Sequence, residues 1–282
     1  SPGQEVRLLE TRPGATGRHL QRWSAPALAR ATQPGQFIHV RSPRTPGLML
    51  PAVPVAGFDR VAGTILTLGD EGDDTTGPLL RLREGDSASF DGPLGRGFAI
   101  DARSRYLLVV ADVDGFPRAR AIVDEAVATG RQVTVLLGAR SVAQVYPSSL
   151  LPDEAEYVVA TADGSLGHHG QVTDLITDYE AWADQCFAAG APALLARMAA
   201  LAQGRDGRMG VARLGRRRGK RPDAGGSDAR RRAWLQLALR HDVGCALGVC
   251  AGCTADGGSG PVRICREGPV FAASELRWEP GT

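Results

Sequence analysis

Four cysteines near the end of the chain have the spacing of a metal centre. Cys245, Cys250, Cys253 and Cys265 form the pattern C-x4-C-x2-C-x11-C. Cysteine thiolates bind iron, and the first three cysteines match the arrangement that holds a [2Fe–2S] cluster in plant-type ferredoxins. Zinc is the main competing interpretation, but zinc sites favour two C-x2-C pairs and the second pair is missing here. The pattern therefore predicts a [2Fe–2S] cluster, whose chemistry is one-electron transfer.

The residues that flank and separate these cysteines are small. Gly244, Gly248 and Gly252 have no side chain, so the backbone can approach the inorganic sulfides and point its N–H groups at them. Such hydrogen bonds stabilise the reduced, more negative cluster. Unrelated thiols would not require glycine between them, and the glycines therefore favour a cluster.

The distribution of cysteine along the chain also indicates a metal site. The first 185 residues contain no cysteine, and the fifth one, Cys186, is interpreted as a small buried hydrophobe. Clustered rather than dispersed cysteines are typical of a reducing compartment. The N-terminus lacks the pattern of a signal peptide, and the chain has no apolar run long enough to span a bilayer. We therefore expect a soluble, cytoplasmic protein without a membrane partner.

Charge is nearly balanced over the whole chain but not within one segment. The net charge of +2 gives no reason to expect binding to nucleic acid. Residues 204–232, however, contain eleven Arg or Lys and three Asp. A solvated linker is the favoured interpretation of this segment, over an arm that binds nucleic acid or an acidic partner face.

Two kinds of sequence pattern precede the basic segment. Short β-runs such as 36–41, separated by glycine and proline, are typical of an antiparallel barrel. After residue 105, an apolar run at 106–110 is followed by helical periodicity at 117–129, and further helices are expected at 172–182 and 191–202. This alternation predicts a Rossmann-like parallel sheet.

The 282 residues, 43% of them hydrophobic, are enough for two or three domains with buried cores. The predicted fold is α+β and multidomain. Its parts are a flavin-type antiparallel β-barrel at 1–100, a Rossmann-like α/β nucleotide domain at 101–203, a basic linker or insert at 204–232 and a small C-terminal [2Fe–2S] domain at 233–282.

The C-terminal residues resemble a known family. The run from Cys245 to Phe271, which contains Cys265-Arg266-Glu267-Gly268-Pro269, is similar to the end of the electron-transfer subunit of dihydroorotate dehydrogenase, within the ferredoxin-reductase superfamily. Weaker matches follow one another in the family's order along the chain. They are Pro34–Phe37, Gly85–Asp86, Gly92–Phe98, Val133–Ser141, Asp163–Gly167 and Val172–Leu175.

The resemblance implies a relay between cofactors. NADH would give a hydride to FAD, which would pass single electrons through the cluster to FMN in a partner, because a flavin takes two electrons together and releases them singly. That partner would be the dihydroorotate dehydrogenase catalytic subunit of pyrimidine biosynthesis, in a heterotetramer. The flavin residues implied by the match are Pro51, Thr76, Gly92, Pro93, Leu94, Gly95, Gly97 and Phe98.

The chain departs from the family where organic cofactors would bind. Leu50 replaces the arginine of the family's Arg-Pro-x-Ser motif, and Asp73-Asp74 replaces a glycine-containing turn. The nucleotide loop keeps Pro117 but carries Asp112 and Asp114 where the family has glycines. Two carboxylates would repel a pyrophosphate, which a helix N-terminus otherwise binds through bare backbone.

A further change lies near the expected nicotinamide, where Ala189-Gly190-Ala191 replaces Cys-Gly-Pro. These changes argue against NAD binding and leave FAD retention open. The alternatives are therefore a structural or electron-wire subunit of another redox complex without flavin or NAD, or a subunit of a related hydrogenase or ferredoxin:NADP oxidoreductase.

Overall fold

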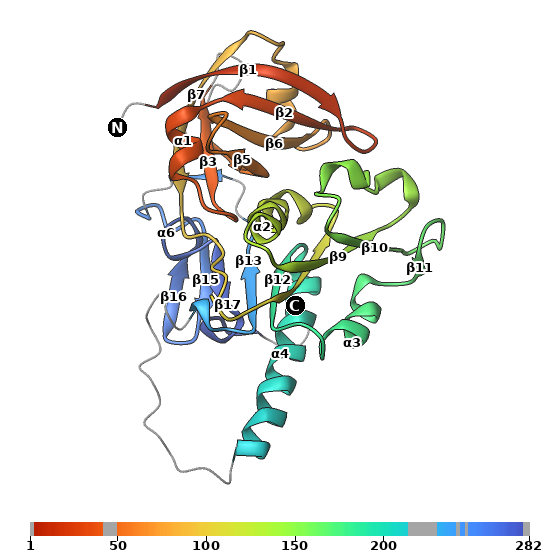
Figure 1. Cartoon of the computed structure of the whole chain (residues 1–282). Helices are drawn as coiled ribbons and strands as arrows, with labels where there is room; N and C mark the ends of the chain where they lie inside the picture. The colour runs from red at the N-terminus through yellow and green to blue at the C-terminus, as the bar shows by residue number, and fades with distance from the viewer. Residues whose placement is uncertain (1–2, 42–49, 214–229, 241–242, 246–247, 279–282) are drawn as a thin grey trace.

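The computed structural model of the chain describes residues 3–41, 50–213, 230–240, 243–245 and 248–278. It has two main sheets, one antiparallel and one parallel, with a small hairpin beside them (Figure 1). This architecture confirms the predicted fold class: a β-barrel sheet, a Rossmann-like sheet and a C-terminal segment that bears the cysteines. None of the helices in the described ranges has the length and hydropathy that crossing a membrane requires.

The antiparallel sheet is formed mainly by the first hundred residues, in the order β14-β4-β3-β7-β1-β2-β6-β5. Alternate residues of its strands point inward, and fully buried Leu8, Trp23, Ile38 and Ile65 form its core. Its elements are β1 (Gln4–Pro13), β2 (Arg18–Ser24), α1 (Pro26–Ala31), β3 (Phe37–Arg41), β4 (Leu50–Pro54), β5 (Gly57–Asp59), β6 (Thr64–Asp70), η1 (Gly77–Arg81), β7 (Ser87–Leu94) and β14 (Val243–Gly244).

The parallel sheet has the order β11-β10-β9-β8-β12-β13-β17, and β17 alone among these strands runs antiparallel to its neighbour. The strands are β8 (Tyr106–Asp112), β9 (Gln132–Ala139), β10 (Glu156–Thr161), β11 (His168–His169), β12 (Gln185–Ala189), β13 (Leu235–Ala238) and β17 (Val270–Ala272). The helical segments are α2 (Phe116–Ala128), η2 (Val142–Gln144), η3 (Ser148–Leu150), η4 (Val172–Leu175), α3 (Ile176–Tyr179) and α4 (Pro192–Arg213).

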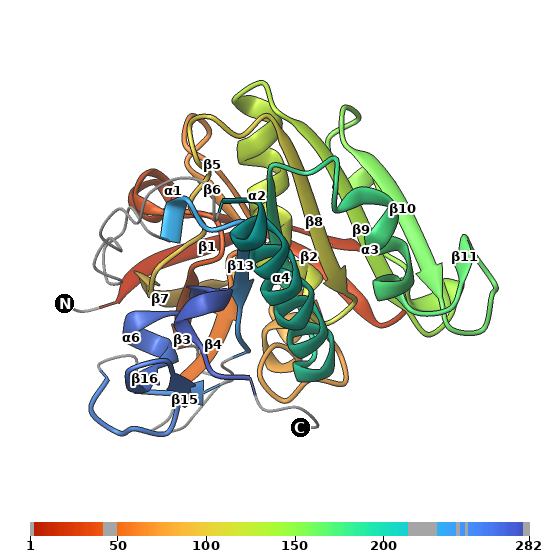
Figure 2. The ribbon, with the colours of Figure 1, turned by 90° about the horizontal axis from the view of Figure 1, so that it is seen from below.

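Strand β8 shows why the apolar run at 106–110 predicts a strand covered on both faces. Leu107 and Val109 belong to the core that packs against α2, whereas Leu108 and Val110 belong to the core that packs against α4. Helix α2 accordingly lies between the two sheets, and Figure 2 shows α4 crossing the opposite face. Helices on both faces are what a parallel sheet requires, because neither face can remain in water.

The last part of the chain is divided between the sheets. The hairpin of β15 (Thr254–Gly257) and β16 (Gly260–Arg263) is followed by α6 (Ile264–Glu267), and η5 (Ala273–Glu275) follows β17. Strands β13 and β17, which the sequence places in a separate cluster domain, extend the parallel sheet. The parallel sheet therefore crosses the predicted boundary at residue 233, because residues 235–238 are buried as a strand.

The predicted boundary at residue 203 falls inside a helix. Helix α4 continues to Arg213, so the first residues of the basic segment are helical in the structure. Residues 230–231 are also helical. Residues 214–229, where the rest of the predicted linker lies, are outside the described ranges.

Candidate iron–sulfur site and cofactor clefts

The β15–β16 hairpin brings two of the four predicted cluster ligands together. Cys253 precedes the hairpin and Cys265 follows it in α6, and the Ile264 N–H donates to the Cys253 carbonyl oxygen at 2.9 Å. Cys253 Sγ lies 3.5 Å from the backbone nitrogen of Cys265. Both cysteines are buried against Phe37 and Ala52 of the barrel. The hairpin thus accounts for the eleven residues that separate Cys253 from Cys265.

The other two cysteines approach this pair from the preceding loop. Cys245 follows β14 and is half-buried, and its charge acts on the Cys265 thiol. Cys250 is exposed, in a loop in which Gly248 has φ +73° and Ala251 has φ +53°. Such backbone turns the loop sharply, as a chain wrapped around a cluster must. The structure therefore leaves Cys250 exposed and Cys245 half-buried, while Cys253 and Cys265 are buried.

The adjacent pair Cys253 and Cys265 can hold one iron of a [2Fe–2S] cluster. Among the described residues, no three potential ligands lie close enough to form a group around a single metal ion. A [2Fe–2S] cluster held by four cysteines needs two thiolates on each iron, and the adjacent Cys253 and Cys265 form one such pair. The residues present therefore fit the cluster.

Burial keeps the Cys265 thiol protonated unless a metal binds to its sulfur. Desolvation, together with the neighbouring Cys253, raises the pKa of the Cys265 thiol to about 12. A thiol with such a pKa keeps its proton near neutral pH unless a cation replaces that proton. Cys186 lies elsewhere, fully buried in β12 with its pKa raised by desolvation, which confirms its interpretation as a small hydrophobe.

Arg263, which the sequence reasoning missed, holds the cysteine loop onto α6. Its guanidinium donates to Glu267 Oε1 at 2.8 Å and to the Gly248 carbonyl oxygen at 3.1 Å. Its backbone N–H also donates to Glu267 Oε2 at 2.7 Å. Arginine four residues before a glutamate is too common a pattern to have signalled this role.

We expect Arg263→Ala to speed the loss of the cluster. Contacts that orient metal ligands affect metal retention by roughly tenfold or more, so cluster absorbance should decay about tenfold faster in the presence of an iron chelator. Arg277→Ala is the matched control, because Arg277 donates to the Gly258 carbonyl oxygen at the far end of the hairpin. Equal decay of the two variants would contradict the assigned role.

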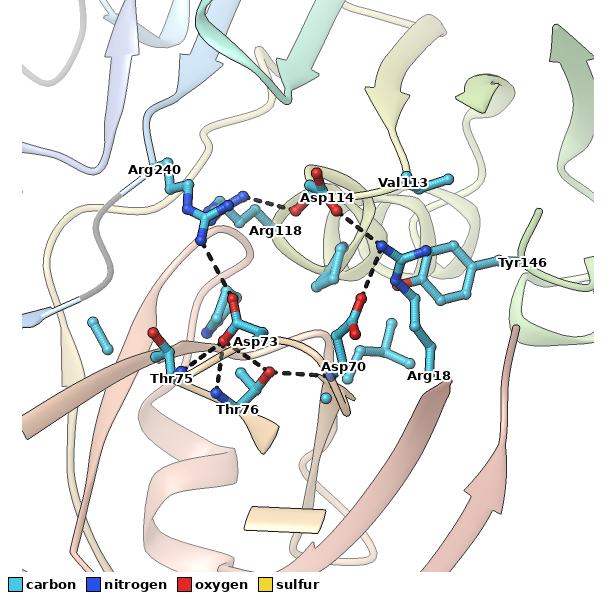
Figure 3. Close-up of a pocket in the computed structure, with 15 residues that line it drawn as sticks. Arg18, Asp70, Asp73, Thr75, Thr76, Val113, Asp114, Arg118, Tyr146 and Arg240 are labelled. Carbon is cyan, nitrogen blue, oxygen red and sulfur yellow. Dashed lines mark hydrogen bonds and ion pairs between the residues drawn. The ribbon is translucent and has the colours of Figure 1, made fainter. Parts of the chain in front are cut away.

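A polar cavity lies between the barrel and the parallel sheet (Figure 3). Arg18 Nη2 lies 2.9 Å from Asp70 Oδ2 and 2.9 Å from Asp114 Oδ1. These two ion pairs join two barrel strands to the start of α2. Arg240 makes a second link, 3.3 Å from Asp73. Asp73 Oδ1 also accepts the backbone N–H of Thr76 at 2.7 Å and its hydroxyl at 3.1 Å.

The residues predicted to bind flavin are divided among three places. Thr76 lines the polar cavity, and Pro51 lies on β4 opposite Val243 of β14. Three of the predicted residues line a second cavity of about 620 Å³ that reaches Cys245; these are Gly92, Pro93 and Leu94. That volume is within the range of cofactor sites.

The remaining predicted flavin residues make contacts within the chain. A side chain at Gly95 would meet the Gly268 carbonyl oxygen at 2.5 Å, and one at Gly97 would meet the Pro34 carbonyl oxygen at 2.4 Å. Phe98 is buried and packs edge-on against Phe187 with ring centroids 5.3 Å apart. In this structure these three residues therefore pack the barrel against the parallel sheet.

The nucleotide loop after β8 does not fit a nicotinamide nucleotide. A pyrophosphate needs backbone N–H groups at the start of a helix. Here the Asp112 carboxylate accepts the Gly115 N–H at 2.7 Å and the Ala191 N–H at 2.6 Å. The expectation that Asp112 and Asp114 oppose NAD binding therefore has a specific geometric basis.

Comparisons with known proteins agree with this arrangement. Residues 241–277 match the family model of the iron–sulfur cluster binding domain of dihydroorotate dehydrogenase B. The dihydroorotate dehydrogenase B (NAD(+)) electron transfer subunit of Listeria monocytogenes is 27% identical over 249 residues, covering 86% of this chain and 87% of the relative. The subunit of the same name from Desulforamulus reducens is 28% identical over 284 residues, 98% of each chain.

Solved structures show a likeness in fold. An NADH-dependent reduced ferredoxin-NADP oxidoreductase, studied for flavin-based electron bifurcation, has a TM-score of 0.74 at 20% identity, covering 96% of this chain and 89% of that one. A ferredoxin NADP+ reductase from Neisseria gonorrhoeae with bound FAD and NADP has a TM-score of 0.54 at 14% identity, covering 69% of this chain and 87% of that one. The fold is that of the ferredoxin reductases. Over most of its length and in its cysteine segment, the chain is similar in sequence to the electron-transfer subunits of dihydroorotate dehydrogenase B.

Proposed function

We propose that this chain is an oxidoreductase subunit that passes single electrons through a [2Fe–2S] cluster held by Cys245, Cys250, Cys253 and Cys265. The observation that carries the proposal is the buried pair Cys253 and Cys265, which the hairpin brings together against the barrel. A cluster supplies one-electron redox chemistry when bound. The chain supplies the thiolates, the apolar cover and the Arg263 contact that holds the cysteine loop.

The proposed partner is an FMN-containing dihydroorotate dehydrogenase catalytic subunit, in a heterotetramer that serves pyrimidine biosynthesis. The names of the relatives support this partner. The cysteine loop supports a protein acceptor at this face, because Cys250 is exposed and the adjacent Val249 is 77% exposed. Clustered cysteines, which favour a reducing compartment, support a location in the cytoplasm.

FAD is the second cofactor proposed. The reductase fold and the predicted residues support it, with Thr76 at the polar cavity and Gly92, Pro93 and Leu94 beside Cys245. A flavin would supply the exchange between paired and single electrons. The chain would contribute the apolar wall of β4 and β7 beside Cys245, while Leu50 offers no charged donor.

The electron-wire alternative is favoured by a specific observation. The Asp112 carboxylate already binds the helix N–H groups that a nicotinamide pyrophosphate would use. In that alternative the cluster receives electrons without a nicotinamide nucleotide.

The cofactor content of anaerobically purified protein tests the proposed function. We expect about two irons and two sulfides per chain, with cluster absorbance that bleaches when dithionite is added. About one flavin per chain would support the flavin relay, and cluster bands without flavin would select the electron-wire form. Zinc in place of iron would contradict both.

A further inference from the structure

The parallel sheet has one position at which its strand order reverses. From β8 the chain continues to β9 on one side, and it later places β12 on the other side. In open α/β sheets, the crevice at the carboxyl ends of two such strands is where nucleotides bind. Here that crevice lies at Asp112, where β8 ends, and at Ala189, where β12 ends.

One side chain occupies the helix donors at this crevice. Gly115 is the N-cap of the 13-residue helix α2, and its N–H donates to Asp112 Oδ1 at 2.7 Å. Ala191 immediately precedes the 22-residue helix α4, and its N–H donates to Asp112 Oδ2 at 2.6 Å. The carboxylate thus bridges the starts of two helices that cover opposite faces of the sheet. It lies where helix dipoles favour a negative charge.

A cavity of about 510 Å³ adjoins the Asp112 carboxylate and is also lined by Arg140, Ala191 and Arg197, but the backbone at the two helix starts is itself tightly packed. A side chain at Gly190 would meet Asp112 Oδ2 at 2.6 Å and Leu194 Cδ2 at 2.7 Å. A side chain at Gly115 would meet the Ala189 carbonyl oxygen at 1.9 Å. The loop after β8 is therefore packed directly against the end of β12, and the Asp112 carboxylate fills the space between the two helix starts.

The barrel reinforces this closure. Asp114 Oδ1 lies 2.9 Å from Arg18 Nη2 on β2, whose guanidinium stands 5.7 Å from the centroid of the Tyr146 ring. Tyr146 stacks in turn on Phe116, the first residue of α2, with ring centroids 4.6 Å apart. The loop is thus held from the barrel side as well as from β12.

From this geometry we infer that the Asp112 carboxylate is a built-in substitute for the pyrophosphate of a nicotinamide nucleotide, and that it closes this site to NAD(H) and NADP(H). The binding part of the inference does not depend on the proposed function. Its consequence for electron flow does rest on that function: the cluster takes its electrons from a donor other than a nicotinamide nucleotide.

The experiment measures binding of NADH and of inorganic pyrophosphate to the full chain with its cluster loaded. We expect wild-type protein to show no NADH binding at about 1 mM and no change in Tm with about 10 mM pyrophosphate. In Asp112→Ala the Ala191 N–H loses its acceptor and the Gly115 N–H keeps only the backbone carbonyl oxygen of residue 112, at 3.1 Å, so pyrophosphate should raise the Tm by about 2–4 °C.

Asp114→Ala is the matched control. It removes one negative charge from the same loop but leaves both hydrogen bonds of Asp112 in place, so we expect no response to pyrophosphate. Asp112→Asn provides a second test where alanine loosens the helix start, because the amide keeps an acceptor oxygen for one N–H while losing the charge. It should respond in the same direction as Asp112→Ala.

Three results would overturn the inference. They are NADH binding by wild-type protein in the micromolar range, an equal pyrophosphate response in Asp114→Ala, or folded Asp112 variants that do not respond. The cluster spectrum of each sample separates these results from a failure of the proposed function. Loss of the cluster bands from wild-type protein would refute electron transfer without touching the assignment of Asp112.

Discussion

Replacing Cys265 with serine is expected to reduce the iron content from about two atoms per chain to nearly none. Cys265 is 2% exposed and lies beside Cys253 in an apolar pocket. A serine hydroxyl there would be a poorer iron ligand than a thiolate, and it would have to lose its proton in the same desolvating surroundings. Iron and sulfide analysis, with the visible spectrum, measures the effect.

Cys186→Ala is the matched control for this prediction. Cys186 is also buried, but it lies in β12 within the core under α4. Its replacement should lower stability modestly by leaving a small cavity and should leave the cluster absorbance unchanged. If Cys265→Ser kept a full cluster spectrum while Cys186→Ala lost it, the assignment of the ligands would be wrong.

The second large effect concerns the connection between the barrel and the parallel sheet. The Gln236 side chain, fully buried on β13, donates to the Ala99 carbonyl oxygen at 2.6 Å and accepts the Ala99 N–H at 2.9 Å. It also donates to the Arg230 carbonyl oxygen at 3.2 Å. On the adjacent strand, Gln185 donates to the same Ala99 carbonyl oxygen at 3.1 Å and accepts the Asp101 N–H at 3.0 Å. Two buried amides therefore fix the segment that joins the domains.

We expect Gln236→Leu to lower the free energy of unfolding by about 3–5 kcal/mol. The substitution leaves the Ala99 N–H without its acceptor and the Arg230 carbonyl oxygen without the Gln236 donor, while the Ala99 carbonyl oxygen keeps its bond from Gln185. Each unsatisfied buried group costs about 1–3 kcal/mol. Because the two glutamines share Ala99, their effects should not be additive. Urea denaturation followed by circular dichroism measures the change.

Gln132→Leu makes the same chemical change at an exposed residue of β9, and it should alter stability by less than about 0.5 kcal/mol. Similar losses in the two variants would mean that the amide network does not stabilise the connection. A stable Gln236→Leu variant would show that water or backbone rearrangement satisfies the freed groups.

Local patterns were sufficient for the cysteine motif and for the classes of the two sheets. The C-x4-C-x2-C spacing is a short-range property, since ligands a few residues apart must lie in one loop whatever the rest of the chain does. Likewise, the apolar run of β8 predicts a strand buried on both faces, and the periodicity of α2 predicts a helix with an apolar stripe. These features follow from neighbouring residues, and the structure confirms the classes of the two sheets.

Tertiary structure alone decided how distant segments combine. That β13 and β17 extend the parallel sheet depends on which edge remains open after β12 has paired with β8, and no local pattern specifies that edge. The sequence indicates that Asp112 adds negative charge to a phosphate loop. Only the fold shows its two oxygens bound to the starts of α2 and α4, because Ala191 is far from Asp112 along the chain and meets it where parallel strands end together.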